Sequence, residues 1–180
     1  RFDQSKQVPE ELLIIAKVAG SEFLWESTDI AAQLMGGRGY LENNIIPKFL
    51  RDARVGRVFE GPTETMLYYM GTRSTFGDQS LLKYLNDELN AADISEKIHS
   101  LLDKYSPKNI QETHQLTKAQ VINNVNYHLG NIIFWGVLYA VARNTKQEHN
   151  ETLSTEWVEN KFQRVFSKFD NRINMGCLFF

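Results

Sequence analysis

The residues best suited to chemistry lie on two glycine turns that flank a basic segment. The first turn reads Gly-Gly-Arg-Gly from Gly36 to Gly39, and the second places the carboxylate of Glu60 between Phe59 and Gly61. Because Gly61 has no Cβ, the backbone there can approach a ligand closely. A carboxylate on such a turn suits proton abstraction from a bound organic substrate. The residues alone also allow a second interpretation, in which Glu60 is a surface glutamate at a helix start.

Two neighbouring features would act on the Glu60 carboxylate in opposite directions. Phe59 would reduce the access of solvent to it, whereas the start of the next helix would favour its charged form. Opposing influences of this kind are typical of a general base that works near neutral pH.

The segment between the two turns is basic, with five cations against two carboxylates. The cations are Arg38, Lys48, Arg51, Arg54 and Arg57, and the carboxylates are Glu42 and Asp52. Arginines suit phosphate groups because the guanidinium presents paired donors. A solvated or internally paired segment is the alternative, and we expect the adjacent Arg51 and Asp52 to form a structural ion pair. The glycine-rich turn is no dinucleotide fingerprint, because a helical pattern precedes it where that motif has a strand.

The composition excludes several classes of protein. The 180 residues carry a formal net charge of −2, so no overall field favours nucleic acid or a membrane surface. A single cysteine, Cys177, rules out an internal disulfide. The four histidines show no spacing typical of metal ligands, and we expect no metal site. The longest apolar run, Ile132–Ala142, is shorter than the roughly 20 residues of a membrane span.

The spacing of apolar residues predicts an all-α fold, a helical bundle. Apolar positions recur every three or four residues, and no segment alternates with period two. Helices are predicted over 9–35, 46–53, 62–70, 78–89, 94–105, 116–143 and 154–174. Pro9 and Pro62 suit first helical turns, and Gly36 suits a helix end. We expect a break over 71–77, which is also the best internal boundary.

Three motifs together resemble the C-terminal region of flavin-dependent acyl-CoA dehydrogenases. They are Gln33–Tyr40, Leu50–Arg54 and Phe59–Gly61, and they match the family in order and spacing. The resemblance covers about residues 9–73 and implies the last two helices of that family's C-terminal four-helix bundle.

The resemblance divides the chain into two regions. Residues 1–75 are expected to form the C-terminal part of the family's helical bundle. Residues 76–180 resemble, by layout and not by motif, the helical C-terminal extension of long-chain members.

The resemblance also implies a reaction and a set of site residues. The reaction is the α,β-dehydrogenation of an acyl thioester, carried by CoA or an acyl carrier protein. Glu60 would remove the α-proton while a β-hydride passes to FAD, and Gly61 would lie along the substrate. The implied FAD contacts come from two segments. Gln33, Leu34, Met35, Gly36 and Gly37 would reach the diphosphate and adenosine side across a dimer interface, and Pro62, Thr63 and Glu64 would face FAD again.

Two of these positions depart from the family pattern. Pro62 stands where the family usually has threonine, so one hydroxyl and one N–H are missing, and we expect Thr63 to compensate. Glu64 stands where many members have glutamine. Its charge is unfavourable beside a diphosphate unless an arginine neutralises it.

The expected partners follow from the same resemblance. They are an acyl thioester, a second copy of the chain in a dimer or tetramer, and an electron-accepting flavoprotein, but no nucleic acid. The expected location is the cytoplasm, or the mitochondrial matrix in a eukaryote. We expect the segment to be inactive by itself, since the family's flavin-ring contacts come from elsewhere. The alternative is a non-catalytic helical module, derived from this family, that serves dimerisation or interaction.

Overall fold

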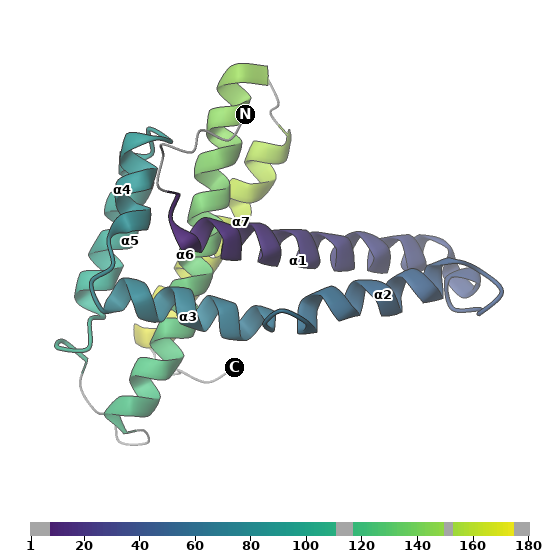
Figure 1. The fold of residues 1–180 in the computed structure, drawn as a ribbon, viewed down its shortest axis with the longest axis horizontal. Helices are drawn as coiled ribbons and strands as arrows, with labels where there is room; N and C mark the ends of the chain where they lie inside the picture. Colours follow the sequence, from purple (N-terminus) through teal and green to yellow (C-terminus); the bar gives the residue numbers. More distant parts are fainter. Residues whose placement is uncertain (1–7, 111–116, 150–152, 175–180) are drawn as a thin grey trace. The chain divides into compact units, whose positions relative to one another are not determined.

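The computed structural model describes residues 8–110, 117–149 and 153–174, and these residues form helices without any strand (Figure 1). The all-α prediction is therefore confirmed. The helices are α1 Glu10–Leu34, α2 Ile46–Val58, α3 Thr63–Thr75, α4 Ser80–Asp87, α5 Ala92–Lys104, α6 Lys118–His149 and α7 Leu153–Asn174, and a 3-10 turn η1 spans Gly36–Gly39. Within the described ranges, no helix has both the length and the apolar character needed to cross a membrane.

The chain divides into two compact units. One contains residues 10–66, and the other contains Val8, Pro9 and the described residues from Leu67 onward. The division falls within α3, so this helix contributes its first turn to one unit and its remainder to the other. The boundary near residue 75, drawn from the resemblance, stays a prediction.

The unit of residues 10–66 is a helical hairpin, in which α1 and α2 lie side by side and η1 joins them (Figure 1). Gly36 follows α1 with φ +54°, the left-handed conformation that commonly ends helices. The two helices approach closely where a Cβ on Gly56 would lie 3.6 Å from Cβ of Ser21. Ser21 and Ala53 are buried along this contact.

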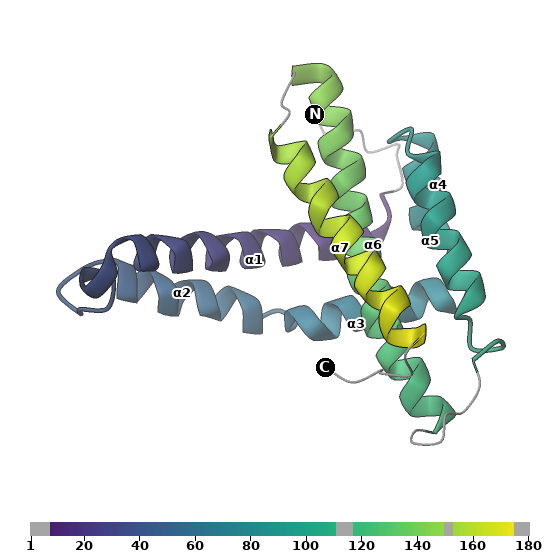
Figure 2. The ribbon, with the colours of Figure 1, turned by 180° about the vertical axis from the view of Figure 1, so that it is seen from behind.

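The second unit is built around α6. Helix α7 lies along α6 in both views, and α5 packs against α6 as well (Figure 2). Gly136 of α6 lies against α5 and α7, because a Cβ there would be 2.9 Å from Cδ1 of Ile98 and 3.2 Å from Cε2 of Phe162. The apolar side chains that fill this core are Leu85, Ile94, Ile98, Val125, Leu129, Ile132, Ile133 and Phe162.

Helix α3 crosses α6 at two glycines. A Cβ on Gly71 would lie 1.9 Å from the carbonyl oxygen of Asn126, and one on Gly130 would lie 1.8 Å from that of Leu67. The buried Asn126 completes the contact. Its amide donates to Oγ1 of Thr72 at 3.1 Å, and its Oδ1 accepts from Oγ1 of Thr75 at 3.0 Å.

This crossing explains why the predicted break over 71–77 begins too early, since the break between α3 and α4 spans 76–79. Helix α3 continues through Gly71 to Thr75. Gly71 lies inside the helix, where its lack of a side chain allows two backbones to meet, and it does not end the helix. A sequence pattern cannot distinguish the two roles, since both need only the absence of a side chain.

We predict that Gly130→Ala lowers the free energy of unfolding of the chain by about 3 kcal/mol, because the added methyl overlaps the backbone of α3. Chemical denaturation followed by circular dichroism measures this change. The matched control is Gly20→Ala on α1, where a Cβ meets nothing within 4 Å. There the better helix propensity of alanine should stabilise the chain by about 0.5–1 kcal/mol. Equal stability of Gly130→Ala and the parent chain would contradict the close crossing.

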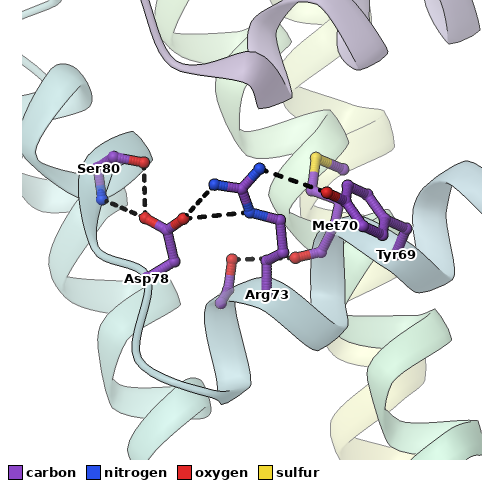
Figure 3. Close-up of polar contacts among 6 residues, drawn as sticks. Tyr69, Met70, Arg73, Asp78 and Ser80 are labelled. Atoms are coloured by element: carbon purple, nitrogen blue, oxygen red, sulfur yellow. Dashed lines mark hydrogen bonds and ion pairs between the residues drawn. The ribbon is translucent and has the colours of Figure 1, made fainter.

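The joint between α3 and α4 is held by one aspartate (Figure 3). Oδ2 of Asp78 accepts from Nε of Arg73 at 3.1 Å and also from Nη2 of the same guanidinium. Its Oδ1 accepts from the backbone N–H of Ser80 at 3.0 Å and from Oγ of Ser80 at 2.7 Å. The Ser80 bonds, and then those from Arg73, lower the pKa of Asp78 from its ordinary 3.8 to about 2.

We predict that Asp78→Asn lowers the free energy of unfolding at pH 7 by about 1–2 kcal/mol, since the charged form of Asp78 is favoured in the folded chain. The folded pKa lies below the unfolded one. The stabilisation is therefore complete above about pH 4 and is lost as the pH falls through about 2. Denaturant titrations of both chains between pH 2.5 and 7 measure this loss. Asp87→Asn, which removes an exposed carboxylate from α4, is the control. A stability gap between Asp78→Asn and the parent that stays constant with pH would contradict the assignment.

Candidate functional site

The turn that carries Glu60 lies between α2 and α3. Helix α2 ends at Val58, and the N–H of Phe59 donates to the carbonyl of Val55 at 2.9 Å. Glu60 and Gly61 follow with φ +56° and +100°, so two successive residues take left-handed backbone conformations. This reversal releases the chain from α2 and leads it into the first turn of α3.

The conformation of Glu60 is unfavourable for its residue type. A left-handed backbone costs a non-glycine residue about 1–2 kcal/mol, and glutamate is not among the residues that tolerate it well. Such residues often mark functional sites, where the backbone places a side chain that another residue type would not supply. The Glu60 side chain is exposed on this turn. Phe59 is 67% exposed, so the expectation that it shields the carboxylate is not met within this chain.

Two side chains of α1 hold the turn from both ends. Nζ of Lys17 donates to the carbonyl of Gly61 at 2.6 Å. Oε1 of Glu22 accepts from Oγ1 of Thr63 at 2.6 Å and from Nε of Arg57 at 2.8 Å. Glu22 thus binds the last turn of α2 and the first turn of α3 at once. Lys17, Glu22 and Arg57 are all partly buried, which shields these charge-assisted bonds from water more than at an open surface.

The glycine at position 61 is favoured by its backbone conformation, since φ +100° strains any residue with a side chain. A Cβ there would lie 2.8 Å from Cε and 3.3 Å from Cγ of Met66. The flexible side chain of Met66 therefore covers Gly61 from one side and would have to shift for a larger residue.

We predict that Glu60→Gly raises the free energy of unfolding of the chain by about 1 kcal/mol, because glycine takes φ +56° without strain. Denaturation of the variant and the parent chain under the same conditions measures the gain. Glu64→Gly is the matched control. It makes the same replacement in the first turn of α3, where glycine should cost about 0.5–1 kcal/mol. A loss of stability in Glu60→Gly would show that the turn relaxes readily around glutamate.

The glycine-rich loop lies at the far end of the hairpin (Figure 1). Gln33, Leu34, Met35, Gly36 and Gly37 are all exposed, and Leu34 is 84% exposed. Gly39 is buried, because a Cβ there would lie 2.2 Å from the carbonyl oxygen of Ala32. This close approach folds the loop back on α1 and leaves the segment before it open.

The five cations of the basic segment have different surroundings. Arg51 pairs with Glu42 at 2.7 Å, and this contact raises the pKa of the arginine and lowers that of the glutamate. The expected pair of Arg51 with Asp52 is therefore wrong, since neighbours in a helix do not face each other. Arg54 and Arg57 lie over the ring of Trp25, at 5.7 and 5.5 Å from its centroid.

Arg38 and Lys48 remain as the cations of the segment with neither an ion pair nor a ring contact to another described residue. Both are exposed, Arg38 within η1 and Lys48 near the start of α2. They therefore place positive charge that no ion pair neutralises within and near the open loop.

The two halves of the predicted site lie at different places along the hairpin. Glu22 contacts the second turn at Thr63, and Gln33 lies eleven residues further along α1. That separation is about 16 Å of helix. Gln33 and the loop glycines therefore do not converge with Glu64 in one copy of the chain. Pro62 and Glu64 are exposed beside Glu60, and Thr63 is buried with its hydroxyl proton directed to Glu22.

Lys17 and Glu22 are the site residues that sequence reasoning missed. They lie near the middle of a long regular helix, and nothing in their spacing indicates that the second turn packs beside them. No group of three or more histidine, cysteine, aspartate or glutamate residues is placed to hold a metal ion within the described ranges.

Comparisons with known proteins point to one family for the first part of the chain. Residues 1–75 match the family model described as acyl-CoA dehydrogenase, C-terminal domain. The chain is similar to the very long-chain specific acyl-CoA dehydrogenase, mitochondrial, of Bos taurus. The two are 32% identical over 75 residues, which make up 42% of this chain and 12% of the bovine protein. The proteins of the same description from Rattus norvegicus and Homo sapiens are each 38% identical over 56 residues, or 31% of this chain and 8% of theirs.

These matches confirm the resemblance drawn from the three motifs, for residues 1–75. The matched part of the chain spans about a tenth of the length of these relatives. No solved structure gives a significant match.

Proposed function

We propose that the chain supplies the C-terminal part of an FAD-dependent acyl-thioester dehydrogenase, because residues 1–75 match the family model described as acyl-CoA dehydrogenase, C-terminal domain. The reaction is the α,β-dehydrogenation of an acyl thioester carried by CoA or an acyl carrier protein. The observation that carries the proposal is Glu60, a glutamate that is kept in a strained backbone conformation where glycine would fit better.

Glu60 acts as the base that removes the α-proton of the substrate. Its turn is fixed at Gly61 by Lys17 and at Thr63 by Glu22, so the carboxylate stands on a rigid support. A fixed base avoids part of the entropy cost of bringing the reacting groups together. The backbone of Gly61 lies beside the substrate, and bound FAD supplies the acceptor for the β-hydride.

The open loop at the far end of the hairpin suits the diphosphate and adenosine side of FAD. Gln33, Leu34 and Met35 end α1 there, and the exposed Gly36 and Gly37 offer backbone N–H groups. Arg38 and Lys48 add positive charge that would stabilise a diphosphate. Because this loop is about 16 Å along α1 from the Glu60 turn, it would serve the site of a second subunit and not that of its own chain.

The residues after Gly61 suit FAD less well. Pro62 has no N–H to donate, and the hydroxyl proton of Thr63 is already directed to Glu22. The Thr63 hydroxyl can therefore only accept a hydrogen bond from a cofactor. It could donate one only if its hydrogen bond to Glu22 were broken. The Glu64 carboxylate would repel a diphosphate. We propose that Pro62, Thr63 and Glu64 contact the FAD of their own subunit only weakly. The loop of residues 33–37 would contact the FAD of the second subunit more strongly.

The surface of the hairpin supports assembly into a dimer or tetramer. Large apolar side chains remain exposed on α1 and α2, among them Leu13 at 70% and Leu24 at 55%. Phe49 and Val55 of α2 are each 49% exposed. Apolar surface on this scale marks contact with further helices. A non-catalytic module would have the same apolar surface, but it would have no need of the strained Glu60.

The remaining partners and the location follow from the relatives. The proposed electron acceptor is a second flavoprotein. The relatives are described as mitochondrial, which supports a mitochondrial location of this chain in a eukaryote, and we propose the matrix within it.

We predict that in the FAD-loaded holoenzyme Glu60→Gln reduces the rate of flavin reduction at least about a hundredfold, because the amide cannot take the α-proton. Stopped-flow bleaching of the flavin absorbance with a saturated acyl thioester measures this rate. Binding of FAD and of the thioester should be retained, since glutamine keeps the shape and most hydrogen bonds of glutamate.

Glu96→Gln provides the control, because Glu96 is an exposed glutamate on α5, outside the proposed site. Its flavin should bleach at the parent rate. Near-parental bleaching in Glu60→Gln would show that the base is another residue, and Glu60 would then be a helix-start glutamate. If the parent protein kept its oligomeric state but did not bind FAD, the result would instead support the non-catalytic module.

A further inference from the structure

A cleft between α6 and α7 has the composition of an anion site. Its volume is about 300 Å³, at the lower end of the range for small-molecule pockets. Tyr127, His128 and Asn131 line it from α6, and Arg164, Lys168 and Phe169 line it from α7. The cleft lies wholly within the unit that begins at Leu67, so the proposed dehydrogenase site in the hairpin does not use it.

The two cations of the cleft are not neutralised by the protein. Arg164 and Lys168 lie one helical turn apart on α7, where like charges repel and destabilise the helix slightly. Neither forms an ion pair with another described residue, and none of the described lining residues carries a carboxylate. Asn131 adds amide N–H groups to the same wall.

Two other cations of this unit, Arg143 and Lys161, have partners. The guanidinium of Arg143 binds both carboxylate oxygens of Asp93, at 2.9 and 2.8 Å. Lys161, one turn before Arg164, lies over the rings of Trp157 and Trp135, at 5.0 and 5.7 Å from their centroids. Arg164 and Lys168 therefore differ from Lys161 on the same helix, whose charge packs against two indole rings.

The rest of the lining is aromatic. His128 lies between Tyr127 and Phe169, with ring centroids 5.3 and 5.9 Å away. Tyr127 and His128 are only partly buried, so part of this wall is open to a ligand. A flat or apolar group can pack on such a wall while an anionic group meets the two cations.

We propose that this cleft binds a small soluble phosphomonoester with an aromatic or apolar body. Phosphate fits better than a single carboxylate, because it can accept from Arg164, Lys168 and Asn131 together. The small volume favours a compact ligand over a long chain.

The test is isothermal titration of the full chain with phenyl phosphate, alongside inorganic phosphate and uncharged phenol. We expect saturable binding of phenyl phosphate, weaker binding of inorganic phosphate and no measurable binding of phenol. The double variant Arg164→Gln with Lys168→Gln should weaken the binding of phenyl phosphate at least about tenfold. Circular dichroism and thermal melting check that this variant is folded.

The matched control is Lys97→Gln with Lys108→Gln, which removes two exposed cations of the same unit outside the cleft. It should bind phenyl phosphate like the parent chain. Equal weakening in both double variants would overturn the proposal, because it would reflect net charge alone. If the chain showed no binding of phenyl phosphate but bound vesicles that contain phosphatidic acid, the ligand would be a lipid surface, and the proposal would be wrong.

Discussion

The contacts that α1 makes with the turn after α2 support the proposed role of Glu60. Glu22 accepts from Thr63 and from Arg57, so one carboxylate joins the end of α2 to the start of α3. Lys17 holds the carbonyl of Gly61 between them. Without these bonds, the two left-handed residues would have little reason to keep their conformation. Removal of the Glu22 carboxylate would also leave Arg57 partly buried without its ion partner, which adds a desolvation cost.

The same support would position Glu60, the proposed base, although glutamate is a flexible residue type. A glutamate side chain has several rotatable bonds, and its free form samples many rotamers. At Glu60 the backbone is fixed on both sides, and the direction in which the side chain leaves the chain is fixed with it. The remaining freedom lies in the side chain itself, which is exposed here. Substrate and neighbouring helices would have to restrict it further, in line with a site completed by other parts of an assembly.

The sequence allowed the helices and the motifs to be predicted, but not most of the contacts between them. The all-α class follows from the apolar period, and the family follows from three motifs at fixed separations. The true end of α3 was missed, because Gly71 serves a contact with α6 that is distant in sequence. The partner of Arg51 was missed because Glu42 lies in a loop whose path the sequence does not reveal. Lys17 and Glu22 could not be found for the same reason, since their role depends on which part of α1 faces the turn. The assignment of the Glu60 and Gln33 groups to particular roles stays a prediction.

The most direct test of the central claim is the exchange of the substrate's α-hydrogen with solvent. The FAD-loaded holoenzyme is incubated in deuterium oxide with a bound acyl thioester analogue that cannot lose its β-hydride, and proton NMR follows the α-position. Proton abstraction by Glu60 predicts steady incorporation of deuterium in the parent enzyme and a loss of at least about a hundredfold in Glu60→Gln. Equal incorporation in the two enzymes would contradict the role of Glu60 as the base.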